Sequence, residues 1–515
     1  MNITILWADD EIDLLRPHIL FLEEKGYVVK TANNGDDAFD IFKEGNIDIV
    51  FLDENMPGLS GLETLSKMKA HNASVPAIMI TKSEEESIME DAIGSKIADY
   101  LIKPVNPNQI LLSVKKNLDE KRLVSERVTS KYQQEFREIG MRLGDRLNVE
   151  EWQELYRKMV YWEMELESSD DNSMLEILEM QKSEANRHFS DFIEDNYLDW
   201  LDGQEPPTLS HTLFKNRIAP ELKSSEGPVF VMVVDNLRLD QWYTIKPELS
   251  RYFRIEEDDT YLSILPTATH YARNAIFSGL MPEDMARLHP DLWKGEDDEG
   301  GKNLKEKEFL AAQLKRLGLD SKFSYNKVTN LKFGKKLAEN FSNLLTNDLN
   351  VIVYNFVDML SHARTDMEVI RELADNNSAY RSLTASWFEH SPLLDIMKQI
   401  AHHKAKMIIT TDHGTIQVSR PSKVVGDRNT NTNLRYKQGK NLQYNSKEVF
   451  DVAHPEDAYL PKSNISSRFL FAKEDMFFVY PNNYNYYVNY YKNTFQHGGI
   501  SLEEVIIPFV SLKAK

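Results

Sequence analysis

Short apolar runs separated by amphipathic stretches dominate residues 1 to about 120. Five of these runs have the length and β-branched content of buried strands, and a segment of helical character follows each. The runs cover residues 3–7, 28–32, 47–52, 77–81 and 100–102. Strands that alternate with helices predict a parallel sheet, and five such units predict the doubly wound order of flavodoxin-like folds. Residues 1–120 are therefore expected to form a first, α/β domain.

The pattern changes between about residues 121 and 205. Residues 148–199 contain neither Gly nor Pro, and Leu155, Met159 and Trp162 recur at helical spacing with charged residues between them. Pro206 and Pro207 then end this pattern. We therefore predict a small helical bundle over residues 121–205.

Strands and helices alternate again over residues 206–515. The runs 229–234, 351–356 and 407–410 are apolar and rich in β-branched residues, which is typical of buried parallel strands. An acidic residue follows each run: Asp235, Asp358 and Asp412. Ligands gather at the carboxyl ends of strands in open α/β sheets, so we expect these three acids to converge. Residues 418–450 are rich in Asn, Lys and Arg and are interpreted as a polar insertion.

Composition narrows the possible functions. The chain has 515 residues, no cysteine and a formal net charge of −20. Any zinc must therefore be held by histidine and carboxylate. An acidic surface repels duplex phosphates, and no basic recognition helix is present, so binding to long duplex DNA is not expected. The N-terminus lacks the basic region of a signal peptide and no segment is apolar for long enough to span a bilayer, so we expect a cytoplasmic location without membrane insertion.

Three acids are expected to meet in the first domain. Asp9 and Asp10 close the first strand, and Asp53 closes the third, which lies beside the first in the predicted order. Such a cluster is costly without a hard divalent cation, and Mg²⁺ prefers oxygen ligands. Thr81 and Lys103 end the fourth and fifth strands, where a hydroxyl and a cation can contact a phosphoryl group.

Residues 1–120 resemble the receiver domain of response regulators. The matching pieces are Ala8-Asp9-Asp10-Glu11, Leu52-Asp53-Glu54-Asn55-Met56-Pro57-Gly58, Ile80-Thr81 and Ile102-Lys103-Pro104. The resemblance implies phosphorylation of Asp53 by a sensor histidine kinase, Thr81 and Lys103 as phosphate contacts, and Tyr100 as an aromatic switch. The Mg²⁺ ligands that it implies are Asp9, Asp10, Asp53 and the carbonyl of Asn55. The alternative is a receiver that serves only as a scaffold.

A second set of metal-ligand types lies in the C-terminal half. Asp358 and His362 are four residues apart, which places both on one face of a helix. Asp412-His413-Gly414 follows an apolar run and offers adjacent oxygen and nitrogen ligands on a turn. Histidine and carboxylate together suit zinc. Any one of these elements alone is more often a helix cap or a simple turn.

This ordered set resembles the alkaline phosphatase superfamily, and within it the PglZ domain, over residues 226–515. The resemblance rests on Asp235-x-x-Arg238-x-Asp240, on Thr269-x-x-x-Arg273 and on the ending Gln496-His497-Gly498-Gly499. It implies a Thr269 nucleophile, with Thr267 as the rival, between two zinc ions. One ion would take Asp358, His362 and His497, and the other Asp235, Asp412 and His413. Arg238, Arg273 and His270 are candidates for contact with substrate.

The order of receiver, helical segment and PglZ domain is similar to that of response regulators associated with type IX secretion in Bacteroidetes. The resemblance implies a phosphorylation-controlled, zinc-dependent phosphodiesterase that acts on short linear or cyclic oligonucleotides. It also implies a phosphorylation-dependent homodimer. The alternative is a docking module with structural metals, which would bind a secretion component or a sigma factor when phosphorylated.

Overall fold

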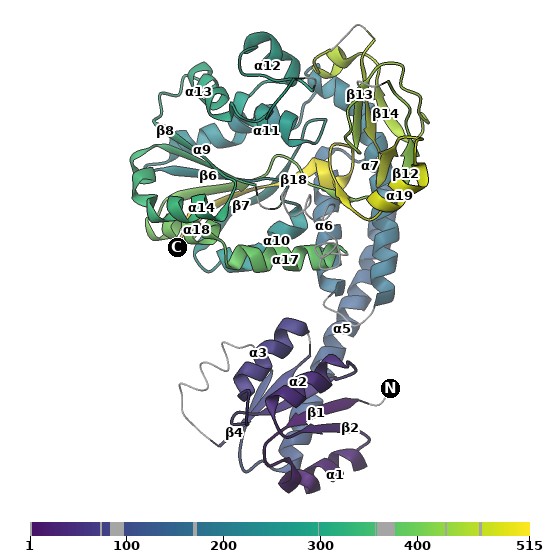
Figure 1. Ribbon diagram of the computed structural model, residues 1–515, viewed down its shortest axis with the longest axis vertical. Helices are drawn as coiled ribbons and strands as arrows, with labels where there is room; N and C mark the ends of the chain where they lie inside the picture. Colours follow the sequence, from purple (N-terminus) through teal and green to yellow (C-terminus); the bar gives the residue numbers. More distant parts are fainter. Residues whose placement is uncertain are drawn as a thin grey trace. The chain divides into compact units, whose positions relative to one another are not determined.

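The computed structural model describes residues 3–72, 75–82, 97–167, 172–296, 298–355, 357, 376–427, 430–462 and 466–515. The chain forms two compact units (Figure 1). The first comprises Met1–Gln134 with Glu165–Met174, and the second comprises Glu135–Met164 with Leu175–Lys515. No helix within these described ranges is long and apolar enough to cross a membrane.

The first unit contains a parallel five-stranded sheet in the order β2-β1-β3-β4-β5, which confirms the flavodoxin-like fold. Its strands are β1 (Thr4–Ala8), β2 (Val28–Ala32), β3 (Ile49–Asp53), β4 (Ala77–Thr81) and β5 (Asp99–Ile102). Its described helices are α1 (Arg16–Glu24), α2 (Gly35–Lys43) and α3 (Gly61–His71), with the 3₁₀ helix η1 (Ile12–Leu15). Successive residues of a strand point to opposite faces. Val50 and Leu52 therefore enter one hydrophobic core while Ile49 and Phe51 enter the other, which is why β3 is apolar throughout.

Three long helices follow, as the middle of the sequence predicts. They are α5 (Pro107–Leu143), α6 (Val149–Glu167) and α7 (Asn172–Leu201). Within the second unit, α6 and α7 pack through aromatic residues, with the rings of Trp152 and Phe189 5.4 Å apart in an edge-on contact. Gln153 of α6 also donates a hydrogen bond of 2.9 Å to the carbonyl of Thr260. Most of α6 and of α7 therefore belongs to the same compact unit as the C-terminal α/β domain.

The second unit is built on a six-stranded mixed sheet in the order β7-β18-β10-β6-β9-β8. The strands are β6 (Val229–Val234), β7 (Phe253–Leu262), β8 (Phe323–Val328), β9 (Leu349–Tyr354), β10 (Lys406–Thr410) and β18 (Ile506–Ala514). Strands β10, β6, β9 and β8 are parallel, and β18 and β7 extend the sheet in antiparallel fashion. Every residue of β6 and of β9 is buried, as expected for strands covered on both faces.

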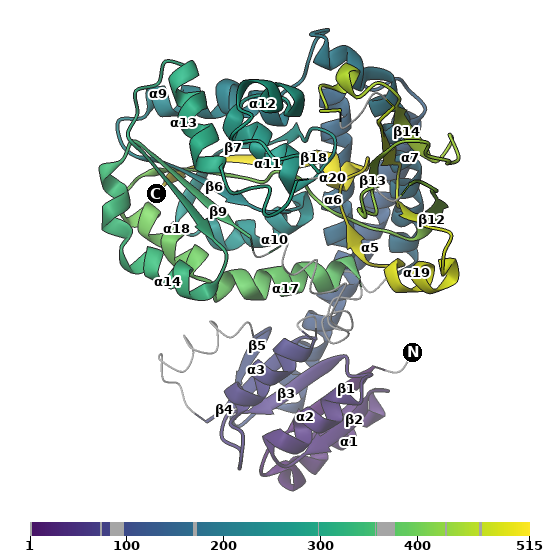
Figure 2. The same cartoon turned by 45° about the horizontal axis from the view of Figure 1, so that its top comes forward.

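Helices cover both faces of this sheet (Figures 1 and 2). One face carries α11 (Thr269–Ser278), α12 (Pro282–Leu288) and α13 (Glu306–Arg316), and the other carries α10 (Leu239–Leu249), α14 (Leu331–Glu339), α17 (Asn377–Glu389) and α18 (Pro392–His402). Shorter helices are α8 (Ser210–Leu213), η2 (Phe214–Ile218), α9 (Ala219–Ser224), η3 (Phe341–Thr346) and α20 (Leu502–Val505).

The polar insertion between β10 and β18 folds into a small β subdomain. A three-stranded antiparallel sheet has the order β13-β15-β14, formed by β13 (Tyr436–Gly439), β15 (Arg468–Ala472) and β14 (Val449–Val452). Two strand pairs and two helices accompany it: β11 (Ile416–Gln417) with β17 (Phe495–Gln496), β12 (Arg420–Lys423) with β16 (Met476–Val479), η4 (Pro455–Ala458) and α19 (Tyr484–Tyr491). Small apolar clusters around Leu470 and Phe477 hold it together.

Candidate functional site

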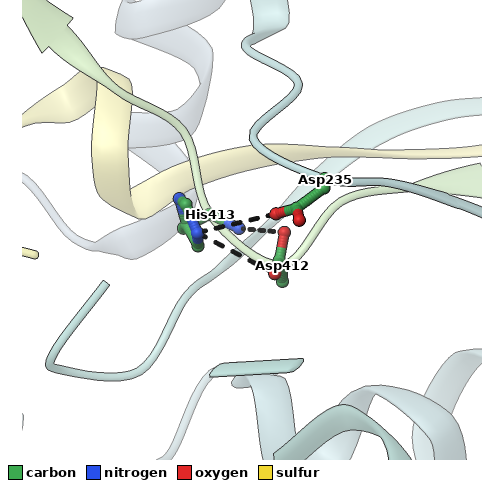
Figure 3. A group of neighbouring side chains, drawn as sticks. All are labelled: Asp235, Asp412 and His413. Carbon is green, nitrogen blue, oxygen red and sulfur yellow. Dashed lines mark hydrogen bonds and ion pairs between the residues drawn. The ribbon is translucent and has the colours of Figure 1, made fainter. Parts of the chain in front are cut away.

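Two acids lie level with one another at the carboxyl edge of the larger sheet. Strands β6 and β10 pair in parallel with Val233 opposite Thr410, so Asp235 and Asp412 follow at the same height. His413 completes the group, and its ligand atom and those of the two acids all lie within 4.8 Å of one another (Figure 3). All three side chains are fully buried. The register of the sheet therefore brings together three residues that lie far apart in the sequence.

The two oxygens of Asp412 have different surroundings. Oδ1 accepts hydrogen bonds from the backbone N–H groups of Asn236 and His413 and from the Thr411 hydroxyl, at 3.3, 3.2 and 3.3 Å. Oδ2 is buried without a hydrogen-bond donor among the described residues. Burial, reinforced by the neighbouring Asp235 carboxylate, raises the pKa of Asp412 to about 8. A cation at Oδ2 would favour the ionised carboxylate and so offset that shift.

His413 is oriented by its own loop. Nδ1 lies 3.0 Å from the carbonyl of Gly414, so the ring proton is assigned to Nδ1 and Nε2 keeps a free lone pair. Burial lowers the pKa of His413, which favours the neutral imidazole that metals bind. Nε2 lies 3.9 Å from Asp235 Oδ1 and 3.8 Å from Asp412 Oδ2. The donor set of two carboxylates and one imidazole fits a divalent cation such as zinc.

His497 lies beside this group. Its ring stacks on that of His413 with centroids 4.2 Å apart and planes 21° apart, and its Nδ1 is 3.1 Å from the carbonyl of Thr267. Asp358 and His362, which the sequence predicts as further ligands, lie outside the described residues. The structure thus places four of the six predicted zinc ligands in one region.

Thr269 is the first residue of α11 and its hydroxyl faces the acids. Oγ1 donates to Asp235 Oδ1 at 3.3 Å and lies 3.0 Å from His413 Nε2. Asn303 fixes the adjoining backbone by donating to the Thr269 carbonyl at 2.9 Å. Thr267 is held differently, because its fully buried hydroxyl donates to the Gly499 carbonyl at 2.8 Å and accepts from the Gly498 N–H at 3.0 Å.

Arg273 stands behind Asp235. Its guanidinium is 1% exposed and lies 2.6 Å from Asp235 Oδ2 and 2.6 Å from Glu306 Oε1. Although burial of Asp235 acts to raise its pKa, Arg273 and His413 lower it overall. Glu306 also accepts from Lys327 at 2.9 Å. Sequence reasoning missed Glu306, because it begins α13 within a run of alternating lysines and glutamates that resembles a solvated helix face.

The other two residues predicted to contact substrate, Arg238 and His270, also interact with other residues of the protein. Arg238 is 2% exposed, pairs with Asp240 and donates to Asn377 at 2.8 Å. The His270 ring stacks on Trp293 with centroids 4.7 Å apart, and its Nε2 contacts the carbonyl of Lys294.

A buried chain of alternating charges joins the helical segment to the α/β domain. Arg381 lies 2.7 Å from Asp240 and 3.0 Å from Glu163 of α6. Lys182 of α7 lies 2.6 Å from Glu163 and 3.5 Å from Glu503. The side chains of this chain are each at most 13% exposed. Because these carboxylates are nearly inaccessible to solvent, their negative charges are stabilised by the neighbouring cations and not by water.

The receiver acids form the second group. Asp9, Asp10 and Asp53 offer oxygens within 4.8 Å of one another, and Asp10 is exposed. Lys103 Nζ lies 2.8 Å from Asp9 Oδ2 and 2.9 Å from Asp53 Oδ1. Burial is the largest cause of a raised pKa at Asp53, and Asp9 and Asp10 add to it. These carboxylates fit Mg²⁺, which would relieve their mutual repulsion.

The remaining receiver residues occupy the same edge of the smaller sheet. The Thr81 hydroxyl at the end of β4 donates to Glu54, and Tyr100 lies in β5 opposite Met79. Asn55 lies two residues after Asp53, the last residue of β3. The Lys103-Pro104 peptide bond is cis.

Three family models match the chain in succession. They describe a response regulator receiver domain over residues 5–115, the PorX response regulator linker domain over 122–201 and the BREX system PglZ alkaline phosphatase-like domain over 213–512. The fold and sites thus define a response regulator that carries an alkaline phosphatase-like domain. The chain belongs to the PglZ family, whose model spans more than half of its length, and its three domains have the PorX-like order. The receiver implies a phosphorylating sensor kinase, and both kinds of domain generally use metals.

Individual relatives match shorter stretches. The transcriptional regulatory protein ResD of Bacillus subtilis (strain 168) is 35% identical over 111 residues, which are 22% of this chain and 46% of ResD. SrrA of Staphylococcus aureus (strain NCTC 8325 / PS 47) is 31% identical over 115 residues, or 22% of this chain and 47% of SrrA. The chain thus spans about half the length of the curated relatives it matches, so their activities are not carried over.

A solved structure shows a comparable likeness. The CheY-like receiver domain from Methanospirillum hungatei JF-1 is 26% identical, with 23% of this chain and 96% of that chain covered and a TM-score of 0.23.

Proposed function

We propose that the C-terminal domain is a zinc-dependent phosphodiesterase whose nucleophile is Thr269. The observation that carries this proposal is the position of the Thr269 hydroxyl, 3.0 Å from His413 Nε2 and 3.3 Å from Asp235 Oδ1. A hydroxyl in this place borders both carboxylate and imidazole ligands. Both hydrogen bonds of Thr267 engage the 498–499 loop instead, which favours Thr269 over its rival.

Two zinc ions are proposed for this domain. One would be held by Asp235, Asp412 and His413, and the other by His497 together with two residues outside the described ranges, Asp358 and His362. When bound, zinc would lower the pKa of a nearby hydroxyl and stabilise negative charge on a phosphoryl group. The buried Oδ2 of Asp412 accepts no hydrogen bond from the described residues and lies 3.7 Å from the Arg273 guanidinium, which supports the presence of a closer cation beside it.

The chain's own residues handle the proton and position the nucleophile. The Thr269 hydroxyl donates to Asp235 Oδ1, which can accept its proton. Thr269 Oγ1 then bonds to phosphorus as the bond to the leaving oxygen breaks, and that oxygen takes up a proton to leave as an alcohol. Water later attacks the threonine-bound phosphodiester, which releases a phosphomonoester and restores the threonine hydroxyl. Because Thr269 begins a helix of ten residues, the positive end of that helix favours an anionic substrate there.

The charges around the site favour a diester over a monoester. A monoester dianion would benefit from an additional cation that is free to reach it. Arg273 is 1% exposed and already contacts both Asp235 and Glu306, so its charge is balanced within the protein. A diester carries one negative charge and needs no such cation. Short linear or cyclic oligonucleotides suit a chain whose net charge is −20, because a short strand presents few phosphates to repel.

Phosphorylation of Asp53 is proposed to control this activity and to shift the protein towards a homodimer. Sedimentation with and without a beryllofluoride phosphate mimic would measure that shift. A role in type IX secretion, through a secretion component or a sigma factor, is proposed from the PorX-like order of the three domains.

The test compares a chromogenic phosphodiester with its monoester on zinc-loaded full-length protein. Thr269→Ala should keep its zinc and lose roughly 10³-fold or more in kcat, since the covalent route is removed while binding persists. Thr267→Val, in the segment before α11, removes the rival hydroxyl and its hydrogen bonds to the 498–499 loop, and should lose less activity than Thr269→Ala. Loss of turnover in the Thr267 variant alone would reassign the nucleophile. If the zinc-loaded wild type cleaves neither ester nor any short oligonucleotide, a docking module is the better description.

A further inference from the structure

A cavity lies in the β subdomain, in the insertion between β10 and β18. Its volume is about 420 Å³, which is within the usual range for small-molecule sites. The segment 430–437 forms one side, and the end of β16 with α19 forms the other. Part of the cavity wall is apolar and is formed by Leu434, Phe478 and Val479. None of the residues assigned to metal or nucleophile lines this cavity.

Lys437 lines the cavity and forms no ion pair with a described carboxylate. Its Nζ donates to the backbone carbonyl of Asn431 at 2.8 Å. Burial alone lowers its pKa to about 8. The one carboxylate in the cavity wall, Asp427, lies 3.9 Å from Lys440. A partly buried ammonium that borders a cavity is stabilised best by an anionic ligand.

A second donor lies beside the lysine. The Asn431 side-chain oxygen accepts from the N–H of Gln438 at 3.2 Å, and its Nδ2 is buried beside the phenol of Tyr436. A side-chain amide has two N–H donors, so one of them can serve a ligand. Asn431 and Lys437 together offer donors to one acceptor-rich group, as a phosphate is.

Tyrosines supply the third element. Tyr480, Tyr487 and Tyr491 line the cavity, and the rings of Tyr487 and Tyr491 are nearly parallel, with planes 12° apart. Tyr480 and Tyr487 are 50% and 37% exposed, so part of each ring is open to a ligand. Aromatic faces stack on nucleobases of any sequence.

We propose that this cavity binds a nucleoside monophosphate unit, with the base against the tyrosines and the phosphate at Lys437 and Asn431. The unit has two possible sources, a free mononucleotide or one nucleotide of a bound oligonucleotide. The nucleotide site itself stands on the cavity, whereas the second source rests on the proposed phosphodiesterase function.

The same segment reaches the neighbourhood of the metal centre. Arg435 pairs with Glu504 at 2.6 Å, and its guanidinium lies 2.8 Å from where a side chain on Gly499 would begin. Tyr436 lies equally close to Gly498, at 2.6 Å from such a position. These two glycines directly follow His497. A ligand that orders residues 430–437 would therefore also constrain the loop that carries His497.

Calorimetric titration of AMP and of GMP into chelator-treated, full-length protein would test the site, because removing metal suppresses binding at the other centre. Lys437→Met should weaken binding by at least about tenfold, as expected for loss of a charge-assisted hydrogen bond. Lys447→Met is the matched control, since Lys447 is exposed in the same subdomain and does not line the cavity. Circular dichroism of both variants would verify that they fold.

No binding of either nucleotide to the wild type, or equal binding by the folded Lys437 variant, would overturn the proposal. Zinc-loaded protein then separates the two sources. A trinucleotide whose KM rises in Lys437→Met, while kcat and the hydrolysis of a small chromogenic diester do not change, identifies the unit as part of the substrate. An unchanged KM together with lost AMP binding identifies a free mononucleotide. A protein without diesterase activity would still give the binding result, so the two proposals fail separately.

Discussion

The backbone carbonyl of Glu503 fills the place where a side chain on Gly414 would stand. A Cβ built on Gly414 would lie 1.9 Å from that oxygen, and the Gly414 N–H donates to the Glu504 carbonyl at 3.1 Å. The turn that presents Asp412 and His413 is thus braced against α20. The Glu503 side chain in turn accepts from Asn186 of α7 at 3.1 Å, so one residue contacts both the turn and the helical segment.

Gly414→Ala should displace this turn. The two atoms nearest to the added Cβ belong to the Glu503 backbone, which cannot rotate away as a flexible side chain could. We therefore expect a loss of about 1–3 kcal/mol in the free energy of unfolding and a reduced zinc content. Chemical denaturation and metal analysis would measure both. Gly227→Ala is the control, because a Cβ there meets nothing within 4 Å and should change stability by less than about 0.5 kcal/mol. A normal zinc content in the Gly414 variant would argue against the bracing role.

Asp412→Asn should lower the zinc content and should also change how the stability of the metal-free protein depends on pH. In metal-free protein the folded-state pKa of Asp412 is about 8, above its ordinary value of 3.8, so the wild type should lose stability as the pH rises between those values. The asparagine variant lacks this titration, and its unfolding free energy should fall less over the same window. Its zinc content should fall because a ligand is lost. Denaturation of both chelated proteins at several pH values, with metal analysis, gives the comparison. Identical pH profiles would contradict it.

Glu163→Gln should show that the helical segment stabilises the α/β domain. The change leaves Lys182 and Arg381 without their shared carboxylate inside the protein, and breaking such a buried pair costs roughly 3–5 kcal/mol. Glu154→Gln is the control, since that side chain is 61% exposed and its pair with Arg142 should contribute less than about 1 kcal/mol. Urea unfolding would measure the difference. Equal midpoints for the two variants would show that solvent replaces the lost partner.

Asp53→Ala should abolish phosphorylation by small phosphodonors with Mg²⁺. Asp53 is 5% exposed, lies 2.9 Å from Lys103 and belongs to the acid cluster, whereas Asp48 caps the N–H of Thr4 away from that cluster. Asp48→Ala should therefore be labelled like the wild type. Intact mass measurement after acetyl phosphate treatment would count the phosphoryl groups. Labelling that persists without Asp53 would place the acceptor elsewhere.

The strands that carry the acids could be predicted because their signals are local. The run before Asp235 spans β6 without error, and the run before Asp412 falls within β10, since buried parallel strands are apolar along their whole length. Parallel pairing then places the acids that follow the strands at one edge. The β subdomain was harder to predict from the sequence, because its strands are only two to five residues long.

Long-range charge partners could not be predicted in the same way. Glu163 and Arg381 are 218 residues apart, and each has the neighbours of an ordinary surface position in the sequence. Glu306 presents the same difficulty. Only the fold reveals that such residues are buried, because the identity of a buried ion pair depends on which distant elements meet.

The buried charges of Arg381, Glu163 and Lys182 also determine where the chain can be divided and fused to another protein without loss of stability. A fragment that begins at residue 206 would omit Glu163 and Lys182 and would uncover the face of the α/β domain that α6 and α7 cover, leaving Arg381 with Asp240 as its remaining carboxylate partner in this chain of charges. The smallest transplantable effector should therefore start upstream of α6, near residue 135, where the second compact unit begins. Chimaeras that exchange one input module for another should be joined within α5, and a junction after α7 would sever the effector from part of its own core.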